Sequence, residues 1–442
     1  MQSKYLSRVA LLVAMGLLAG CRQAQAPPPP TALPDKIVFI VMDTLRKDNL
    51  PFYGYPKDTA PFLTHLANRA YVFDNAFAAS SWTAPATASL FTSLYPFQHG
   101  VITGIAATLS IKKSGYKLDV NRIPEEAETL GEVMKKAGYE TFGIAANLNI
   151  SDTQGFAQGF DFFVTMNGDP AKNVTAHIES LRPRLFAAKK YFLYLHYMDP
   201  HSPNNGWGDT FDRSLTGVAR EISAYDSEIL YCDTHIQRMA RVFEWRKDAL
   251  VIFTADHGEG FQEHGISGHG NNLFGEVLNV PLFIHPPGGL AEARRIAEPV
   301  SHLDVLPTLR EMAGLPAAAE AEGLSLLPLL RREALTQEPR TLFAHLYRTP
   351  GHRGRNRETV HEAALQDGWK WVGGTDDHGL FELVRDPAEV DDRTPSRPQV
   401  ARALETRYRD FKGQARKLQG VTGTLKLDEE NLERLKALGY VN

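Results

Sequence analysis

Four short runs of apolar residues constrain the fold of this chain more than any other feature. Residues 36–42, 141–146, 191–196 and 250–254 are almost continuously hydrophobic. Runs of this length without polar alternation are typical of strands buried on both faces of a parallel sheet. Segments predicted to be helical separate them, namely 61–70, 88–94, 129–137, 174–187 and 221–243. Strands that alternate with helices predict a doubly wound α/β fold with a mostly parallel central sheet.

Acidic and imidazole side chains follow three of the predicted strands. Asp43 comes directly after the first strand, His201 lies just past the third, and Asp256 and His257 follow the fourth. Because the carboxyl ends of parallel strands meet at one edge of a sheet, we expect these side chains to lie together. Carboxylate oxygens and imidazole nitrogens are ligands for Mn²⁺, Zn²⁺, Ca²⁺ or Mg²⁺. The sequence therefore predicts a site for one divalent metal ion, or for two.

Further polar residues can complete such a site. His264 and His269 lie in a glycine-rich loop, and the hydroxyl-rich segment 80–89, which contains Thr83, leads into a predicted helix. A single histidine is more often structural than catalytic, and a hydroxyl before a helix is often only an N-cap. The alternative for the hydroxyl is a nucleophile, since a helix N-terminus stabilises developing negative charge.

The N-terminal segment has the features of an export signal. Two basic residues precede an apolar run at 9–18 that is too short to span a bilayer, and the run closes on Leu18-Ala19-Gly20-Cys21. This ending resembles a bacterial lipobox, which predicts residues 1–20 as signal peptide and Cys21 as the lipid-attachment site; a plain signal peptide is the alternative. Residues 21–35 contain four consecutive prolines and predict an extended tether. The expected location is the cell envelope, with the protein held to a membrane through its lipid.

Composition indicates an ordinary globular protein with a smaller second unit. The net charge of −4, with acidic and basic residues interspersed along the sequence, argues against nucleic acid as a partner. Around residues 316–323 the chain becomes rich in alanine and glutamate. This change predicts a catalytic domain at 36–325 and a C-terminal subdomain at 326–442, with strands at 341–347, 363–372 and 380–384 and a helix at 428–438.

Several segments, in their order and spacing, resemble the sulfatase family of the alkaline phosphatase superfamily. The resemblance runs from Lys36 almost to the C-terminus and rests on segments 37–46, 53–55, 83–96, 159–161, 199–201, 256–259, 280–282, 365–371 and 381–383. It implies an alkaline-phosphatase-like three-layer α/β/α sandwich with a small antiparallel C-terminal sheet.

The resemblance also implies roles for individual residues. Asp43, Asp256 and His257 would bind the metal, and Thr83 would complete the set of ligands and act as the nucleophile. His201 and His269 would contact the transferred oxyanion or protonate the leaving group. Substrate contacts would come from Thr87, Asn147 and His264. The implied partner is an anionic ester, which could be a glycan, a lipid headgroup or a small molecule.

Departures from the family pattern bear on the reaction. Many sulfatases oxidise a Cys or Ser nucleophile to formylglycine, and Thr83 cannot form that aldehyde because its β-carbon carries a methyl group. Thr87 stands where the family has an arginine, and segment 145–148, Ala-Ala-Asn-Leu, replaces a lysine- and histidine-containing sulfate clamp. A threonine nucleophile resembles the phosphotransferases and phosphodiesterases of the superfamily.

Three hypotheses follow from these departures. The first is hydrolysis or transfer of a phosphate mono- or diester at Thr83, a metal-dependent reaction. The second is hydrolysis of a sulfuric ester on a glycan or a small molecule. The third is an inactive sulfatase-like domain that only binds its ligand. We place phosphate chemistry first because Thr83 excludes the formylglycine route.

Overall fold

The computed structural model describes residues 32–104, 117–208, 210–336, 338–348, 357–375 and 378–426. The predicted signal peptide, Cys21, most of the tether and the predicted helix at 428–438 lie outside these ranges. Within the ranges, no helix has the length and hydrophobicity needed to cross a bilayer.

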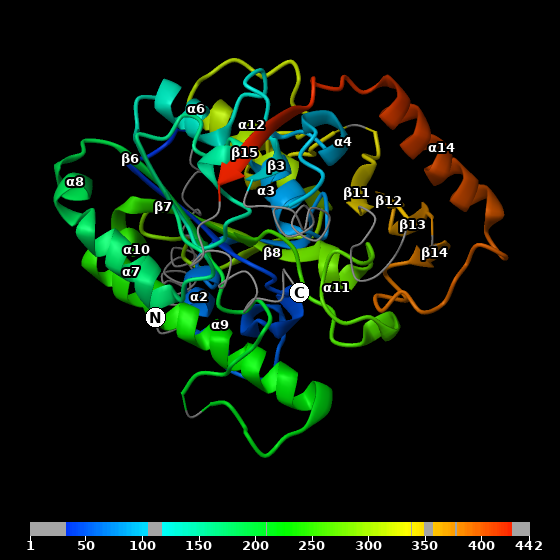
Figure 1. Ribbon diagram of the computed structural model, residues 1–442, viewed down its shortest axis with the longest axis horizontal. Coiled ribbons are helices and arrows are strands. Elements are labelled where there is room, and N and C mark those ends of the chain that lie inside the picture. The colour runs from blue at the N-terminus through cyan, green and yellow to red at the C-terminus, as the bar shows by residue number, and fades with distance from the viewer. Residues whose placement is uncertain are drawn as a thin grey trace, which may run out of the picture.

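A large sheet forms the centre of the molecule (Figure 1). Its strands in spatial order are β10 (Val300–Ser301), β2 (Tyr71–Phe77), β8 (Asn279–His285), β7 (Ala249–Ala255), β1 (Lys36–Met42), β6 (Tyr191–Tyr197), β4 (Glu140–Ala145) and β5 (Phe162–Thr165), and β9 (Arg294–Ile296) pairs with β2. Among the described strands of this large sheet, β8 alone runs antiparallel to its neighbours. The mostly parallel sheet predicted from the apolar runs is confirmed, and β1, β6 and β7 at its centre are buried over almost their whole length.

Helices cover both faces of this sheet. On one face α9 (Gly217–Val242) contacts α2 (Pro61–Ala67), α7 (Ala171–Ser180) and α10 (Trp245–Asp248). On the other face α3 (Thr83–Thr92), α6 (Leu130–Lys136) and α12 (Val305–Met312) contact one another (Figure 1). The predicted three-layer α/β/α sandwich is therefore confirmed. Shorter helices are α4 (Pro96–His99), α8 (Arg182–Ala187), α11 (Gly275–Leu278) and α13 (Leu327–Leu330).

A second, antiparallel sheet lies C-terminal to the first, as predicted. Its strands in order are β11 (Leu342–Arg348), β12 (Thr359–Gln366), β13 (Trp369–Gly374) and β14 (Gly379–Glu382). Helix α14 (Pro398–Gln414) packs on this sheet, with Tyr408 buried beside Phe343 and Trp371. The small sheet also contacts the segment between β2 and α3, since the amide of His345 donates to the carbonyl of Ala79 at 2.9 Å.

Three predicted elements differ from the structure. The predicted strand 363–372 is a hairpin, because Asp367 and Gly368 both adopt positive φ and form the tight turn between β12 and β13. The predicted helix 174–187 is divided into α7 and α8, and Pro183 sits in the first turn of α8, where its missing N–H is tolerated. Helix α3 begins at Thr83 and not at residue 88.

Several elements were not predicted. They include helices α12 and α14, the strands β2, β5, β8, β9 and β10 of the large sheet, and the pairing of β15 (Val421–Lys426) with β3 (Lys117–Arg122) in a separate two-stranded sheet.

Candidate active site

Three adjacent strands bring acid and imidazole groups together at their carboxyl ends. Asp43 follows β1, Asp256 follows β7, and His196 is the second-last residue of β6. The strand register places Met42 beside both Tyr197 and Ala255, so the three side chains emerge at the same level. One potential ligand atom from each lies within 4.8 Å of the others, and all three residues are buried.

The cluster contains buried polar atoms that have no hydrogen-bond partner among the described residues. Oδ2 of Asp43 accepts a hydrogen bond from Nδ2 of Asn147 at 2.8 Å, and Oδ1 of Asp256 accepts from the amide of His257 at 2.8 Å. The other oxygens, Oδ1 of Asp43 and Oδ2 of Asp256, have no hydrogen-bond partner, nor do the ring nitrogens of His196. Burying charged groups without hydrogen bonds costs several kcal/mol, in order of magnitude. The donor set therefore fits a divalent cation, which would satisfy these atoms together.

Charges within the cluster shift its pKa values. Burial and the nearby carboxylate of Asp256 raise the pKa of Asp43. Burial favours the neutral ring of His257, but Asp256 and Asp43 outweigh it and raise its pKa. Nε2 of His257 lies 3.6 Å from Oδ1 of Asp43 and 3.5 Å from Oδ2 of Asp256. The imidazole thus lies between the two carboxylates.

Thr83 is held at the cluster by the start of α3. The helix is buried throughout, Trp82 is its N-cap residue, and Thr83 is its first residue. Oγ1 of Thr83 lies 3.2 Å from Nε2 of His257. The hydroxyl is therefore both at the positive end of a helix dipole and within hydrogen-bonding distance of a base.

The tautomer of His257 follows from its other contact. Nδ1 lies 2.9 Å from the carbonyl oxygen of Gly258. A carbonyl can only accept, so Nδ1 carries the proton and donates. In the neutral ring Nε2 then has its lone pair directed toward Thr83 and the carboxylates, where it can accept a proton or bind a metal.

The two other predicted catalytic histidines lie next to the cluster. The ring of His269 lies 4.6 Å from that of His257 and 4.9 Å from that of His201, measured between centroids. Oε2 of Glu259 lies 3.2 Å from Nδ1 of His269 and holds the ring. Burial lowers the pKa of His201, so this ring is neutral over a wider pH range than a free imidazole.

The three predicted substrate-binding residues occupy different surroundings. Thr87 lies one turn after Thr83 on α3, buried, and its hydroxyl has no hydrogen-bond partner within the described ranges. Asn147 holds Asp43, so its amide group is committed to the cluster. His264 stacks on Phe274 at 3.9 Å, and its nitrogens lie 3.2 Å from Oε1 of Glu276 and from the carbonyl of Glu389. His264 thus connects its loop to the C-terminal unit, and direct contact with substrate stays a prediction.

Sequence reasoning gave no role to two residues that the structure brings to the site. His196 was visible as an imidazole near a strand end, but β6 is buried on both faces, so no alternation shows which side chain reaches the edge. Glu259 follows the Asp-His-Gly turn, and only the fold of the loop 260–269 brings His269 back onto it.

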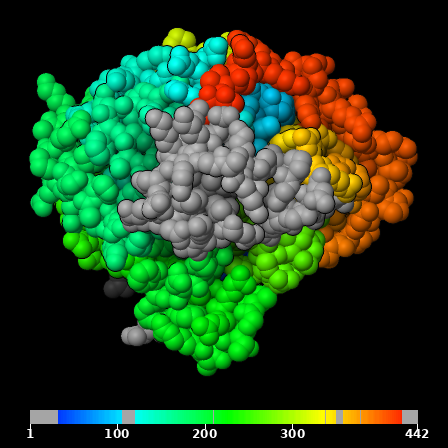
Figure 2. Space-filling view, viewed as in Figure 1, coloured from blue at the N-terminus to red at the C-terminus, as the bar shows by residue number. Residues whose placement is uncertain are grey.

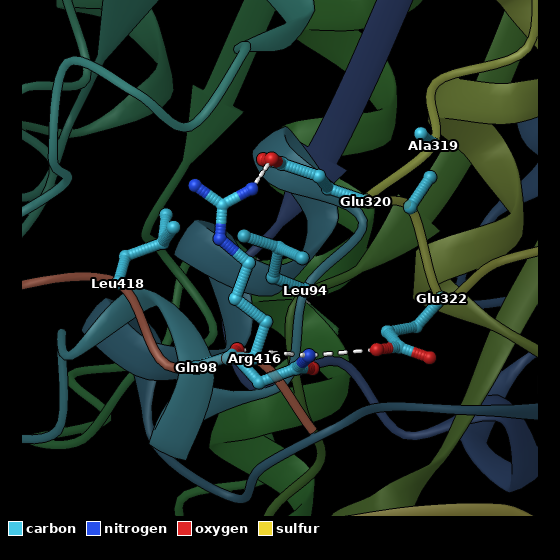
Figure 3. A pocket seen from close by; sticks show the side chains of 8 residues that line it. Leu94, Gln98, Ala319, Glu320, Glu322, Arg416 and Leu418 are labelled. Atoms are coloured by element: carbon cyan, nitrogen blue, oxygen red, sulfur yellow. Dashed lines mark hydrogen bonds and ion pairs between the residues drawn. The ribbon is translucent and has the colours of Figure 1, made fainter. Parts of the chain in front are cut away.

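A cavity of about 320 Å³ lies near the opposite end of α3 (Figure 3). Leu94, Gln98, Glu322 and Arg416 are among its lining residues, and Nε2 of Gln98 donates to Oε1 of Glu322 at 2.7 Å. Arg416 and Glu320 form an ion pair at its rim. Its charged groups are already paired with each other, so we assign it no catalytic role.

Comparison with known proteins identifies the family. The profile named Sulfatase matches residues 35–315, which is more than half of the chain. The chain belongs to the sulfatase family. A second profile, described as N-sulphoglucosamine sulphohydrolase, C-terminal, matches residues 263–414 and includes the small sheet. This sulfatase-family protein is accordingly an ester hydrolase, and its buried Asp43, His196 and Asp256 agree with the divalent metal typical of the family.

Individual relatives are distant but cover most of the chain. A Delta 4,5-hexuronate-2-O-sulfatase from Bacteroides thetaiotaomicron is 24% identical over 72% of this chain and 75% of its own length. An arylsulfatase from Clostridium perfringens is 23% identical, with 80% and 89% covered. The solved structure of a 2-O GAG sulfatase has a TM-score of 0.68 at 18% identity and covers 88% of this chain and 95% of that chain. A phosphonate monoester hydrolase of Agrobacterium radiobacter has the same TM-score at 16% identity, with 89% and 100% covered.

Proposed function

We propose that this protein hydrolyses sulfuric esters, with unmodified Thr83 as the nucleophile and with a sulfated sugar as the substrate class. The observation that carries the proposal is the position of the Thr83 hydroxyl, 3.2 Å from His257 and beside the Asp43, His196 and Asp256 cluster. The relatives support sulfate over phosphate, because the curated proteins described above are named as sulfatases. This reverses the order expected from the sequence, where phosphate was placed first.

Asp43, His196, Asp256 and His257 would hold the divalent cation. When bound there, it would lower the pKa of the Thr83 hydroxyl and neutralise the anionic group of the substrate. The chain's own groups account for the remaining steps. Thr83 Oγ1 attacks sulfur and its proton passes to solvent water, a new O–S bond forms, and the bond from sulfur to the departing sugar oxygen breaks.

His269 and His201 face the other side of the reacting group. We assign to His269, oriented by Glu259, the proton that the departing alcohol oxygen needs. Nδ1 of His201 lies 2.5 Å from the carbonyl oxygen of Ser202 and donates to it, so a hydrogen bond from Nε2 of His201 to the oxyanion requires the protonated ring. Water then attacks sulfur, the bond to Thr83 breaks, and hydrogen sulfate leaves with the threonine restored.

A phosphate ester is the second candidate, and a specific observation favours it. Thr83 cannot supply the aldehyde by which formylglycine sulfatases release sulfate, and a phosphonate monoester hydrolase shares this fold. Asn147 is bound to Asp43 and Thr87 is uncharged, so neither supplies a cation to grip sulfate.

One preparation can separate the two candidates. Aryl sulfate and bis-aryl phosphate are compared at equal concentration, and the Thr83 peptide is then analysed by exact-mass spectrometry. We expect faster turnover of the sulfate and a sulfo-adduct on Thr83. A phospho-adduct with faster phosphate turnover would establish the second candidate, and neither turnover nor adduct would contradict both and favour the inactive hypothesis.

We also propose that the protein acts in the cell envelope as a lipoprotein anchored through Cys21. The support is the lipobox-like Leu18-Ala19-Gly20-Cys21 after a short apolar run. Labelling of cells with a radioactive fatty acid should mark the protein, and Cys21→Ser should remove the label.

A further inference from the structure

The edge of the sheet opposite the catalytic cluster has an unusual surface. Residues 182–190 contain four basic residues and no acidic one, although the whole chain has a net charge of −4. Two more basic residues lie on the neighbouring α10. We call the six together the basic face: Arg182, Arg184, Lys189, Lys190, Arg246 and Lys247, all exposed.

An exposed aromatic ring lies within the basic face. Phe186 is 57% exposed, and the guanidinium of Arg182 lies 5.4 Å from its centroid. The ring also stacks on Phe243 at 5.3 Å, and Phe243 in turn stacks on Trp245 of α10. These contacts join α8 and α10 into one surface, and both helices lie on the left side of the molecule (Figure 1).

Few carboxylates neutralise this surface. Arg184 pairs with Glu140, and Lys247 lies 4.0 Å from Glu244. Arg182, Lys189, Lys190 and Arg246 form no ion pair with any residue that the structure describes. An exposed aromatic ring surrounded by unpaired cations is the composition expected of a surface that binds anionic lipid headgroups.

The N-terminal segment enters the fold at this same edge. The amide of Tyr191 donates to the carbonyl of Asp35 at 2.9 Å, and the hydroxyl of Tyr139 donates to the carbonyl of Pro34 at 2.7 Å. Lys190 immediately precedes Tyr191, so the segment that leads to the predicted lipid-attachment site leaves the domain beside the basic face. At about 3.3 Å per residue, the seven residues of β1 place Asp43 roughly 20 Å away, at the opposite edge.

We propose that the basic face binds the surface of an anionic phospholipid bilayer and turns the catalytic cluster away from it. The site then opens toward soluble or cell-surface substrates and not toward headgroups of the anchoring membrane. The inference concerns a surface remote from the active site, so it is independent of whether sulfate or phosphate is the substrate.

Vesicle sedimentation tests the proposal on the mature chain from position 21 with Cys21→Ser, which removes any lipid. We expect binding to vesicles that contain phosphatidylglycerol, loss of binding at high salt, and none to phosphatidylcholine alone. Each basic residue near the headgroups contributes about fivefold, so Lys189→Glu with Lys190→Glu should weaken binding at least about tenfold. Phe186→Ser should weaken it about fivefold.

The matched control reverses two exposed charges on α14, whose orange and red atoms lie at the right of the molecule (Figure 2), whereas α8 and α10 lie at its left (Figure 1). Arg402→Glu with Arg407→Glu should leave binding unchanged, and all variants should retain turnover of a soluble ester. Equal binding by the two double variants would overturn the proposal. Equally strong binding to soluble dextran sulfate that does not depend on Phe186 would also overturn it, since the partner would then be a polyanion and not a bilayer.

Discussion

The hydroxyl oxygen of Thr83 lies 3.2 Å from Nε2 of His257, and this contact joins the first turn of α3 to the turn after β7. Thr83 comes from the helical layer and His257 from the turn that follows a strand of the sheet. The packing of these two layers therefore fixes the position of the nucleophile. A threonine that served only as a helix cap would not need a buried imidazole beside it.

Thr83→Ala should lower kcat by about 10³-fold or more, because it removes the atom that attacks sulfur while the metal ligands stay. Thr83→Ser keeps the hydroxyl and should retain activity within about tenfold. Steady-state rates with an aryl sulfate measure both. Thr92→Ala is the control on the same helix, since Oγ1 of Thr92 bonds to the carbonyl of Ala88 and not to the site. Unchanged activity in Thr83→Ala would contradict the covalent mechanism.

His269→Ala should slow sugar sulfates far more than aryl sulfates with good leaving groups. An alkoxide leaving group needs the proton that His269 supplies, and a nitrophenolate does not. We expect a loss of about 10²-fold or more in kcat for the poor leaving group and a much smaller loss for the good one. Glu259→Gln should show the same pattern more weakly, because it loosens the ring without removing it. Equal losses on both substrates would assign the histidine to binding.

Metal loading should stabilise the folded protein. Asp43 and Asp256 keep buried oxygens without a hydrogen-bond partner in the described part of the chain, and a cation removes their mutual repulsion. A ligand at 100 times its dissociation constant adds about 2.7 kcal/mol to the free energy of unfolding. Chelator-treated protein should therefore melt several degrees higher when Ca²⁺, Mg²⁺, Mn²⁺ or Zn²⁺ is restored.

Asp256→Asn should abolish that shift. Asp233→Asn is the matched control, because Asp233 is also buried but accepts from the backbone amides of Phe62 and Leu63 at the start of α2. Differential scanning fluorimetry compares them. If the metal still raises the melting temperature of Asp256→Asn, the ion binds at a different site.

The sequence was most informative where one physical constraint dominates. Burial on both faces forces apolar runs, and the predicted strand at 36–42 therefore matches β1. Asp43 and Asp256 were predictable as a pair because parallel strands end at one edge. His196 could not be assigned in the same way, since all of β6 is buried and the pattern does not distinguish its inner and outer side chains.

Contacts between segments that are far apart in the sequence could not be predicted from local residue patterns. Strand β15 pairs with β3, with Val421 opposite Arg122, and nothing local to either segment specifies that partner. The hairpin at Asp367 and Gly368 is a different case, because Asp-Gly between two strand-like runs is a known turn signal that the single predicted strand passed over. Roles of individual residues came from the family resemblance, and geometry then showed Asn147 bound to Asp43.

The last prediction concerns acid stability and depends on His99, which is buried under α3. Its Nδ1 accepts from the amide of Val101 at 3.1 Å, so Nε2 carries the proton and contacts Oγ of Ser89 at 3.1 Å. Burial lowers the pKa of His99 to about 3 in the folded state, against about 6.5 in an unfolded chain. Between these values the unfolded state binds a proton that the folded state does not bind. The contribution of His99 to the free energy of unfolding is therefore complete above pH 6.5 and falls as the pH drops toward 3.

One such group changes the free energy of unfolding by about 1.4 kcal/mol per pH unit. His99→Gln cannot take up that proton, so urea unfolding from pH 7 to 4 should show a slope shallower by up to this amount. An unchanged slope would mean that His99 is already protonated in the folded protein.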